Sequence, residues 1–140
     1  MTFVPNSLAV LVAALAAFII GFLWHGPVFG KQWIKMMKIP KSEIDAMKAK
    51  GMGPMIPRMI AALAQQLVFA TVVSHLASAL GVAGAVPAIL FAVLLWLGFV
   101  ATILLNTVLW ENRKMELYLF NVAYHLVSLV AVTLIVVMWR

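Results

Sequence analysis

Four long apolar segments without charged residues divide the chain, and every charged residue lies between or after them. The segments cover about residues 8–24, 59–80, 88–110 and 117–139, and none contains Asp, Glu, Lys or Arg. A helix needs about 20 apolar residues to cross the hydrocarbon core of a bilayer. The pattern therefore predicts four membrane-spanning helices.

The overall composition agrees with this pattern. Of the 140 residues, 66% are hydrophobic and 10% are charged, whereas soluble domains average roughly 45–50% and 25%. A soluble all-helical protein is the alternative, but a chain of this size leaves too much of its surface exposed to hide so many apolar side chains. We predict an all-α integral membrane four-helix bundle that forms a single domain over residues 1–140 and contacts the lipid bilayer.

The basic residues lie mainly in the connections on one side of the predicted bundle. Seven lie between the first two segments and two between the last two, which leaves only Arg140 for the other side. Basic connections remain in the cytoplasm by the positive-inside rule. We therefore expect a multi-pass protein of the cell inner membrane with both termini outside.

A cleaved signal peptide is the alternative interpretation of the first apolar segment. Such a peptide needs a basic leader and small residues at its cleavage site. Residues 1–5 include no basic side chain, and bulky residues such as Trp24 end the apolar run. We expect the segment to be retained as a membrane span.

The first cytoplasmic connection, residues 26–57, predicts a short amphipathic helix. Phe29, Trp33, Met36 and Met37 recur at helical spacing, with lysines on the other faces. This pattern is typical of a helix that lies in the headgroup layer of a membrane. A surface for a partner protein or a nucleic acid is the alternative, and we expect no nucleic-acid partner.

A second short helix is predicted over residues 42–50. Ser42 is the expected N-cap, acidic residues follow it in the first turn, and lysines lie in the last turn. This order of charges suits the helix dipole. The run of Gly, Met and Pro at residues 51–54 should end the helix.

Small residues recur every fourth position in the first span, at Ala9, Ala13, Ala17 and Gly21. Such a row lets two helices approach closely inside a membrane. The sequence leaves open whether the partner helix lies in the same chain or in another copy. We expect a homo-oligomer.

Polar side chains within the spans are predicted to converge in the cytoplasmic half of the bilayer. The rise of 1.5 Å per residue puts several of them at similar depths, and polar groups in hydrocarbon are costly unless paired. They should therefore face inward, either as a ligand-binding or conducting layer or as hydrogen bonds that only join the helices. The set comprises Gln66, Thr102, Asn106, Asn121, Tyr124 and His125, and Glu111 joins it from the connection directly after the third span.

No enzymatic site is expected, because all four acidic residues lie outside the apolar segments and no Ser–His–Asp set can be assembled. The chain lacks cysteine, which excludes thiolate chemistry. We expect no metal and no cofactor, although haem ligation by His25 and His125 is a distant alternative. Transport of a neutral or anionic solute is the first hypothesis, and a structural or partner-binding membrane subunit is the second.

Three segments resemble the motifs of a bacterial membrane protein family called domain of unknown function 1761. They are residues 23–33 (LWHGPVFGKQW), 106–113 (NTVLWENR) and 121–127 (NVAYHLV). The resemblance extends over nearly the whole chain and implies a bacterial four-helix membrane protein, but no activity. Its matching positions fall at the same end as the polar set, which predicts a single site there, formed by Asn106, Glu111, Asn121, Tyr124 and His125.

Overall fold

The structure, a computed structural model, describes residues 6–140 and confirms the all-α fold. Four helical rods are long and apolar enough to cross a membrane, and each overlaps one of the four apolar segments of the sequence. The rods are Ser7–Val28, Gly53–Ala79, Ala85–Leu109 and Met115–Met138.

The rods and the first connection consist of shorter elements, some of which are not regular α-helix. In chain order these are α1 (Ser7–Leu23), a first π-helical turn (Trp24–Val28), α2 (Gly30–Met37), α3 (Lys41–Lys50), a 3-10 turn (Gly53–Met55), α4 (Ile56–Ala79), α5 (Ala85–Trp96), a second π-helical turn (Leu97–Ala101), α6 (Thr102–Leu104), α7 (Asn106–Leu109) and α8 (Met115–Met138).

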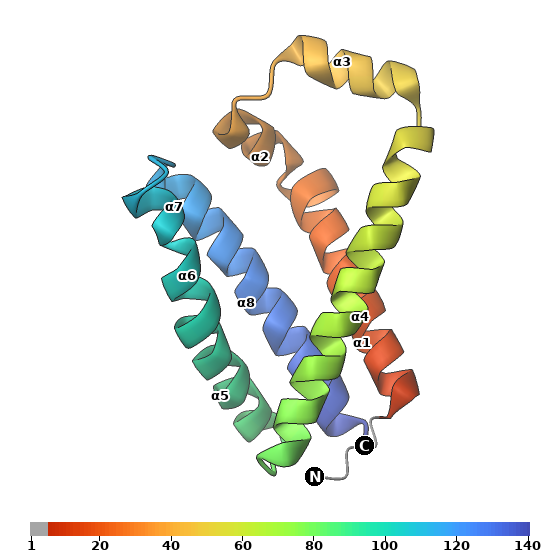
Figure 1. The fold of residues 1–140 in the computed structure, drawn as a ribbon, viewed down its shortest axis with the longest axis vertical. Coiled ribbons are helices and arrows are strands. Elements are labelled where there is room, and N and C mark those ends of the chain that lie inside the picture. Colours follow the sequence, from red (N-terminus) through yellow and green to blue (C-terminus); the bar gives the residue numbers. More distant parts are fainter. Residues whose placement is uncertain (1–5) are drawn as a thin grey trace.

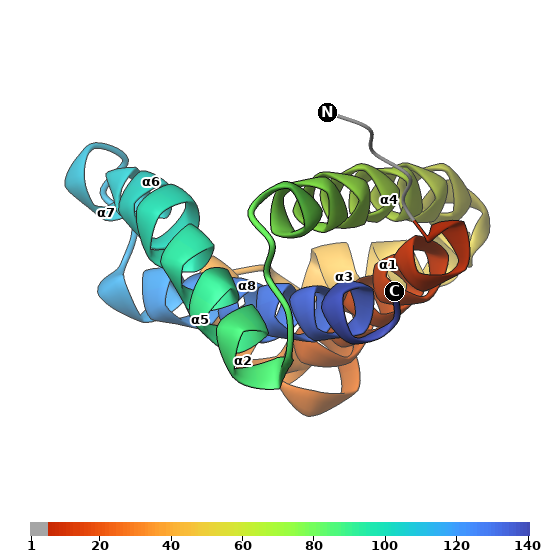
Figure 2. The ribbon, with the colours of Figure 1, turned by 90° about the horizontal axis from the view of Figure 1, so that it is seen from below.

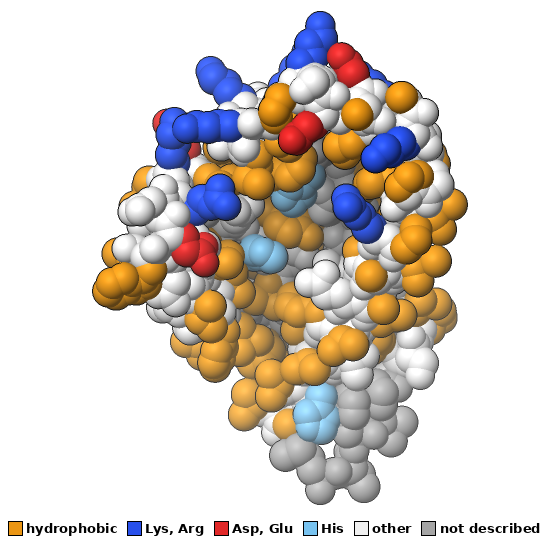
Figure 3. All heavy atoms as spheres, turned by 45° about the horizontal axis from the view of Figure 1, so that its top comes forward, with side chains coloured by type: hydrophobic (Ala, Val, Ile, Leu, Met, Phe, Trp, Pro, Cys, Tyr) orange, Lys and Arg blue, Asp and Glu red, His pale blue; other side chains and the backbone are white. Residues whose placement is uncertain are grey.

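The bundle is open, with α1 and α8 packed together at its centre. The helix α4 packs on both α1 and α8, while α5 packs on α8. From the hairpin that joins them, α4 and the α5–α7 rod diverge as the arms of a V (Figures 1 and 2). We call the end with the hairpin, the start of α1 and the end of α8 the terminal end, and the end with α2, α3 and the α7–α8 turn the basic end. Figure 3 shows lysine and arginine side chains gathered at the basic end.

Small side chains form the part of the core where α1, α4, α5 and α8 come together. Ala13, Ala17, Ala70, Ala77 and Ala92 are completely buried. Alanine at these positions lets the helix backbones approach closely, which matters because lipid gives apolar helices no hydrophobic reason to associate. Larger apolar residues point outward in all four rods.

The ladder of small residues in α1 is used within the chain. Ala9, Ala13 and Ala17 have at most 1% of their surface exposed, and Gly21 contacts Tyr124 of α8. The close approach that the ladder predicts is therefore made to α8 and α4 of the same chain.

Local sequence signals fix the terminal end. The side chain of Asn6 caps α1 by accepting a hydrogen bond from Ala9 N, and its amide donates to Trp139 O across 3.1 Å. This second bond holds the start of α1 against the end of α8. Gly81 and Gly84, with φ of 69° and 89°, close the α4–α5 hairpin in conformations that favour glycine.

The two short helices of the first connection are present, but one predicted cap is wrong. The helix α3 begins at Lys41 and its N-cap is Pro40, so Ser42 lies inside the first turn. Pro40 has extended backbone angles that suit an N-cap, and its fixed φ moves the helix start upstream of the serine. Gly51 ends α3 with φ of 69°.

The third rod is joined to α8 by two side-chain hydrogen bonds at its π-helical turn. Trp96 Nε1 donates to Val122 O at 2.7 Å, and Tyr118 OH donates to Ala101 O at 2.7 Å. These bonds fix the depth and rotation of the rod, since few other polar contacts are available in an apolar bundle.

Replacing Trp96 by phenylalanine should lower the free energy of unfolding by about 1 kcal/mol, because the substitution removes the indole donor to Val122 O. Trp110→Phe is the matched control, since Trp110 is 80% exposed and should tolerate the change. Reversible unfolding in mixed detergent micelles measures both variants. Equal losses in the two variants would contradict the proposed role of the bond.

Candidate functional site

The first rod bends sharply at its basic end because of the dipeptide Gly26-Pro27. Proline disfavours helical angles at the preceding residue and has no backbone N–H to donate. Gly26 accordingly takes φ −118° and ψ −105°, outside the helical region. The helix α2 then folds back so closely that a Cβ at Gly30 would lie 3.1 Å from His25 O. The bend thus fixes the position of the residues just before it.

Aromatic and histidine side chains from this bend meet α8 in one cluster at the basic end. The rings of His25 and Tyr124 have centroids 5.0 Å apart, and those of Tyr124 and His125 are 4.8 Å apart. His25 also makes edge contacts with Trp33 and Phe120, each at 5.6 Å. We define the aromatic–histidine cluster as Trp24, His25, Phe29, Trp33, Phe120, Tyr124 and His125.

His25 is held in a defined protonation pattern by the backbone of α1. Its Nδ1 lies 2.9 Å from Gly21 O. Because a carbonyl oxygen can only accept, Nδ1 must carry the hydrogen, which leaves Nε2 as the acceptor of the neutral ring. The rings of His25 and His125 both contact the ring of Tyr124, so two imidazoles flank the phenol.

Tyr124 links three of the four rods. Its hydroxyl lies against Gly21 of α1, where an added Cβ would come within 2.8 Å of the oxygen. The side chain of Gln66 on α4 lies near enough to the phenol to interact with it. A residue larger than glycine at position 21 would displace the phenol from this place.

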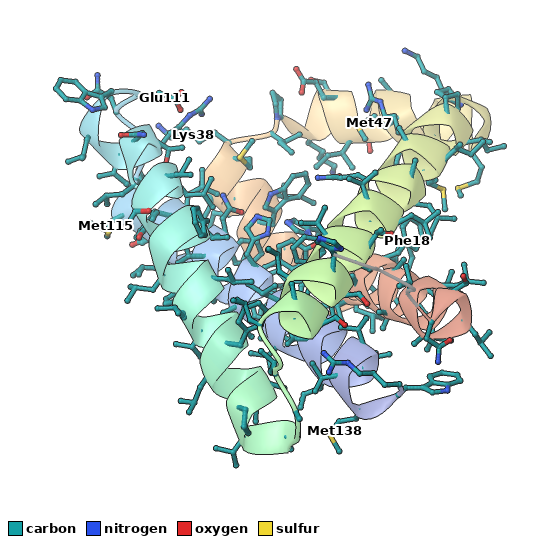
Figure 4. All side chains as sticks on the ribbon, turned by 60° about the horizontal axis from the view of Figure 1, so that its bottom comes forward. Phe18, Lys38, Met47, Glu111, Met115 and Met138 are labelled. Atoms are coloured by element: carbon teal, nitrogen blue, oxygen red, sulfur yellow. The ribbon has the colours of Figure 1, made fainter. Side chains whose placement is uncertain are left out.

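A pocket of about 400 Å³ opens between α1 and α4 beside Tyr124. Its walls are mainly apolar, and Phe18 lies in the angle between the two helices (Figure 4). Arg58 lines the pocket toward the basic end, while Gln65, Gln66 and Tyr124 line it deeper in the bundle. A volume of this size is within the range of small-molecule sites. Figure 3 shows basic side chains around a hollow at this end of the molecule, with histidine side chains inside it.

The structure brings together three of the seven predicted site residues. Gln66, Tyr124 and His125 are half-buried and belong to the cluster or its edge. Asn121 is half-buried one helical turn before His125 on α8. These four are consistent with a polar layer in the half of the bundle near the basic end.

The prediction that the polar side chains of the spans face inward is wrong for two of them in the single chain. Thr102 and Asn106 are exposed on the outer arm of the V, and Thr102 Oγ1 donates to Gly98 O of its own helix at 2.7 Å. Glu111 is exposed at the far corner, beyond the tip of α7 (Figure 4). The inward positions were expected because unpaired polar groups are costly in hydrocarbon, but Thr102 meets that cost by bonding its own helix and needs no partner from another rod.

Sequence reasoning missed several residues of the site. Trp24 was noted only as a bulky residue at the end of the first apolar segment, yet its Nε1 is buried and has no hydrogen-bond partner within residues 6–140. Arg58 was counted as a topology signal, yet it lines the pocket. The repeated aromatic residues between Trp24 and Trp33 were the available signal for the cluster. Across residues 6–140 no group of three His, Cys, Asp or Glu side chains is arranged to hold a metal ion.

The contact between Gly21 and Tyr124 generates a stability prediction. Gly21→Ala should destabilise the protein by about 1–3 kcal/mol, because the new methyl overlaps the phenol oxygen. Tyr124→Phe should recover part of this loss in the double variant, since it removes that oxygen. Gly98→Ala is the control, as nothing lies within 4 Å of a Cβ there. Thermal unfolding followed by tryptophan fluorescence measures the set, and an unchanged Gly21→Ala variant would disprove the close contact.

Comparison with known proteins identifies a family for this fold and site. No curated protein and no solved structure matches the chain. A family model described as "Protein of unknown function (DUF1761)" matches residues 8–137, which include all four rods, the bend and the cluster. The chain therefore belongs to the DUF1761 family, as the motifs in its sequence indicate.

Proposed function

We propose that the protein is a small carrier or channel-like protein of the bacterial inner membrane, which acts as a homo-oligomer on a neutral or anionic solute. The observation that carries the proposal is the pocket between α1 and α4. It has the volume of a ligand site and presents Arg58, Gln65, Gln66 and Tyr124 to its interior. Polar groups in such an apolar wall are the usual means of orienting a bound solute.

The charges favour a neutral or anionic solute. The four acidic residues, Glu43, Asp45, Glu111 and Glu116, are all exposed, and none lines this pocket. A cation in the pocket would need a carboxylate in its lining or a ring of carbonyl oxygens around it. Arg58 gives an anion a partner at the basic end.

The distribution of basic residues supports an orientation with the basic end in the cytoplasm. Lysines of α2 and α3 and of the α7–α8 turn lie at the same end of the structure, opposite both termini (Figures 1 and 3). The positive-inside rule assigns that end to the cytoplasm. The pocket would then open in the cytoplasmic half of the membrane.

A groove between α4 and α5 supports association with a second copy. It measures about 310 Å³, and only apolar atoms line it. Val72 of α4, Phe99 of the second π-helical turn and Leu129 of α8 contribute to its walls. A helix from another copy could fill the open side of the V, as an alternative to acyl chains.

The same groove is the observation that favours a second candidate function. A structural or partner-binding subunit would use the groove for another membrane protein and would need no solute path. The two candidates differ in one measurable property, since only the first moves a solute across a sealed membrane.

Solute movement is tested in vesicles that contain the purified protein. Glycerol, urea, lactate and hexyl sulfate are the probes, and at least one should cross faster than in protein-free vesicles. Ala62→Phe should abolish the increase because Ala62 lines the pocket. Ala61→Phe is the matched control, since the adjacent Ala61 is exposed outside it. Rates equal to protein-free vesicles for all four probes would refute transport and leave the subunit hypothesis.

Association through the groove predicts a difference between two neighbouring valines of α4. Val72→Trp should shift the mass of the particle toward the monomer, because the indole would occupy the groove. Val68→Trp should not, since Val68 is 66% exposed and lines no part of the groove. Native mass spectrometry from lipid nanodiscs gives the copy number, and a monomeric wild type would contradict the oligomer.

A further inference from the structure

Two polar side chains at opposite ends of the α1–α4 pocket have no partner in the described chain. Within residues 6–140, no carboxylate pairs with Arg58 and no group bonds the side-chain amide of Gln65, although both line the pocket. An unpaired amide at the depth of a membrane span carries a cost that a bound group would remove. Both side chains are exposed in the single chain and line the same pocket, so both are available to a group bound there.

The spacing of Arg58 and Gln65 sets the length of a ligand that can contact both. Arg58 and Gln65 are seven residues apart on α4, which is nearly two full turns, so they lie on the same face about 10 Å apart along the helix axis. Between them the walls are apolar, with Phe18 and Phe22 from α1 and Met59 and Ala62 from α4. The pocket thus has a cationic end, an apolar middle and a hydrogen-bonding end.

The cationic end continues into a second hollow. This hollow of about 430 Å³ shares Met52, Met55 and Arg58 with the first pocket and adds Lys48 and Lys50. No acidic side chain lines either space. The entrance is therefore positively charged, and its charge is complementary to an anion that arrives from the basic end.

We propose that this pocket binds a medium-chain anionic amphiphile, an acid whose charged group pairs with Arg58 and whose far end carries a hydroxyl or carbonyl that bonds Gln65. A simple inorganic anion fits the pocket less well than an amphiphile, because the apolar walls would leave most of its oxygens without hydrogen bonds. They suit an alkyl chain, which removes apolar surface from water. The methionines of the entrance adapt to chains of different shape.

The assignment rests on the proposed function, since it names the class of solute for the same pocket. It is tested by equilibrium binding, which needs no transport. The protein is placed in nanodiscs of phosphatidylcholine and titrated with radiolabelled hydroxydecanoate whose hydroxyl is on the terminal carbon. Decanoate is compared by competition, and empty nanodiscs give the background.

The expected result is saturable binding, with a Kd for decanoate about three- to tenfold higher than that for the hydroxy acid. This ratio corresponds to the loss of one hydrogen bond. Arg58→Gln should weaken both ligands by tenfold or more. Gln65→Leu should weaken only the hydroxy acid, to the affinity of decanoate. This loss of discrimination is a readout that a purely structural role of Gln65 would not produce.

Lys41→Gln is the control for charge, because Lys41 is exposed on α3 and lines neither hollow. Binding no greater than in empty nanodiscs, or equal effects of Arg58→Gln and Lys41→Gln in variants with wild-type melting temperatures, would overturn the assignment. Saturable binding without any flux in vesicles would instead refute the carrier function and leave this ligand site standing. Flux of glycerol or lactate without binding of either acid would refute this ligand site and leave the carrier function standing.

Discussion

The close approach of α1 to α8 is the constraint on which the rest of the structure depends. Fully buried alanines bring the two backbones together along most of their length, and Gly21 continues that contact to the level of Tyr124. Because the phenol fits only against a residue without a side chain, it stays in reach of Gln66 on α4. The bend at Gly26 then turns His25 onto the same phenol. One contact between two helices thus organises the cluster and one wall of the pocket.

The two arms of the V are held by different kinds of interaction. The third rod is fixed to α8 by hydrogen bonds from Trp96 and Tyr118. The helix α4 is attached mainly through small apolar side chains near the terminal end, such as Ala70 and Ala77. Hydrogen bonds in an apolar bundle fix depth and rotation, whereas packing of small residues fixes only the distance between the helices. The third rod is therefore the more closely specified arm.

The sequence was sufficient for the fold because hydrocarbon imposes strict requirements on length and charge. Four uncharged segments had to be helices, since only helices satisfy their own backbone groups in lipid. Helix faces were harder to predict. The cost of unpaired polar groups in hydrocarbon placed Thr102 and Asn106 inside, but both are exposed, and Thr102 bonds its own backbone instead. Arg58 was missed for another reason. The positive-inside rule already accounted for a basic residue in the first connection, and no sequence periodicity indicated a pocket between α1 and α4.

The arrangement of α4 has a mechanical consequence. This one helix is a wall of the ligand pocket on its α1 side and a wall of the apolar groove on its α5 side. The tight hairpin at Gly81 and Gly84 joins it to α5. A rotation of α4 about that hairpin that narrows one space must widen the other. A ligand that widens the pocket would therefore narrow the groove, and a neighbouring helix that widens the groove would narrow the pocket.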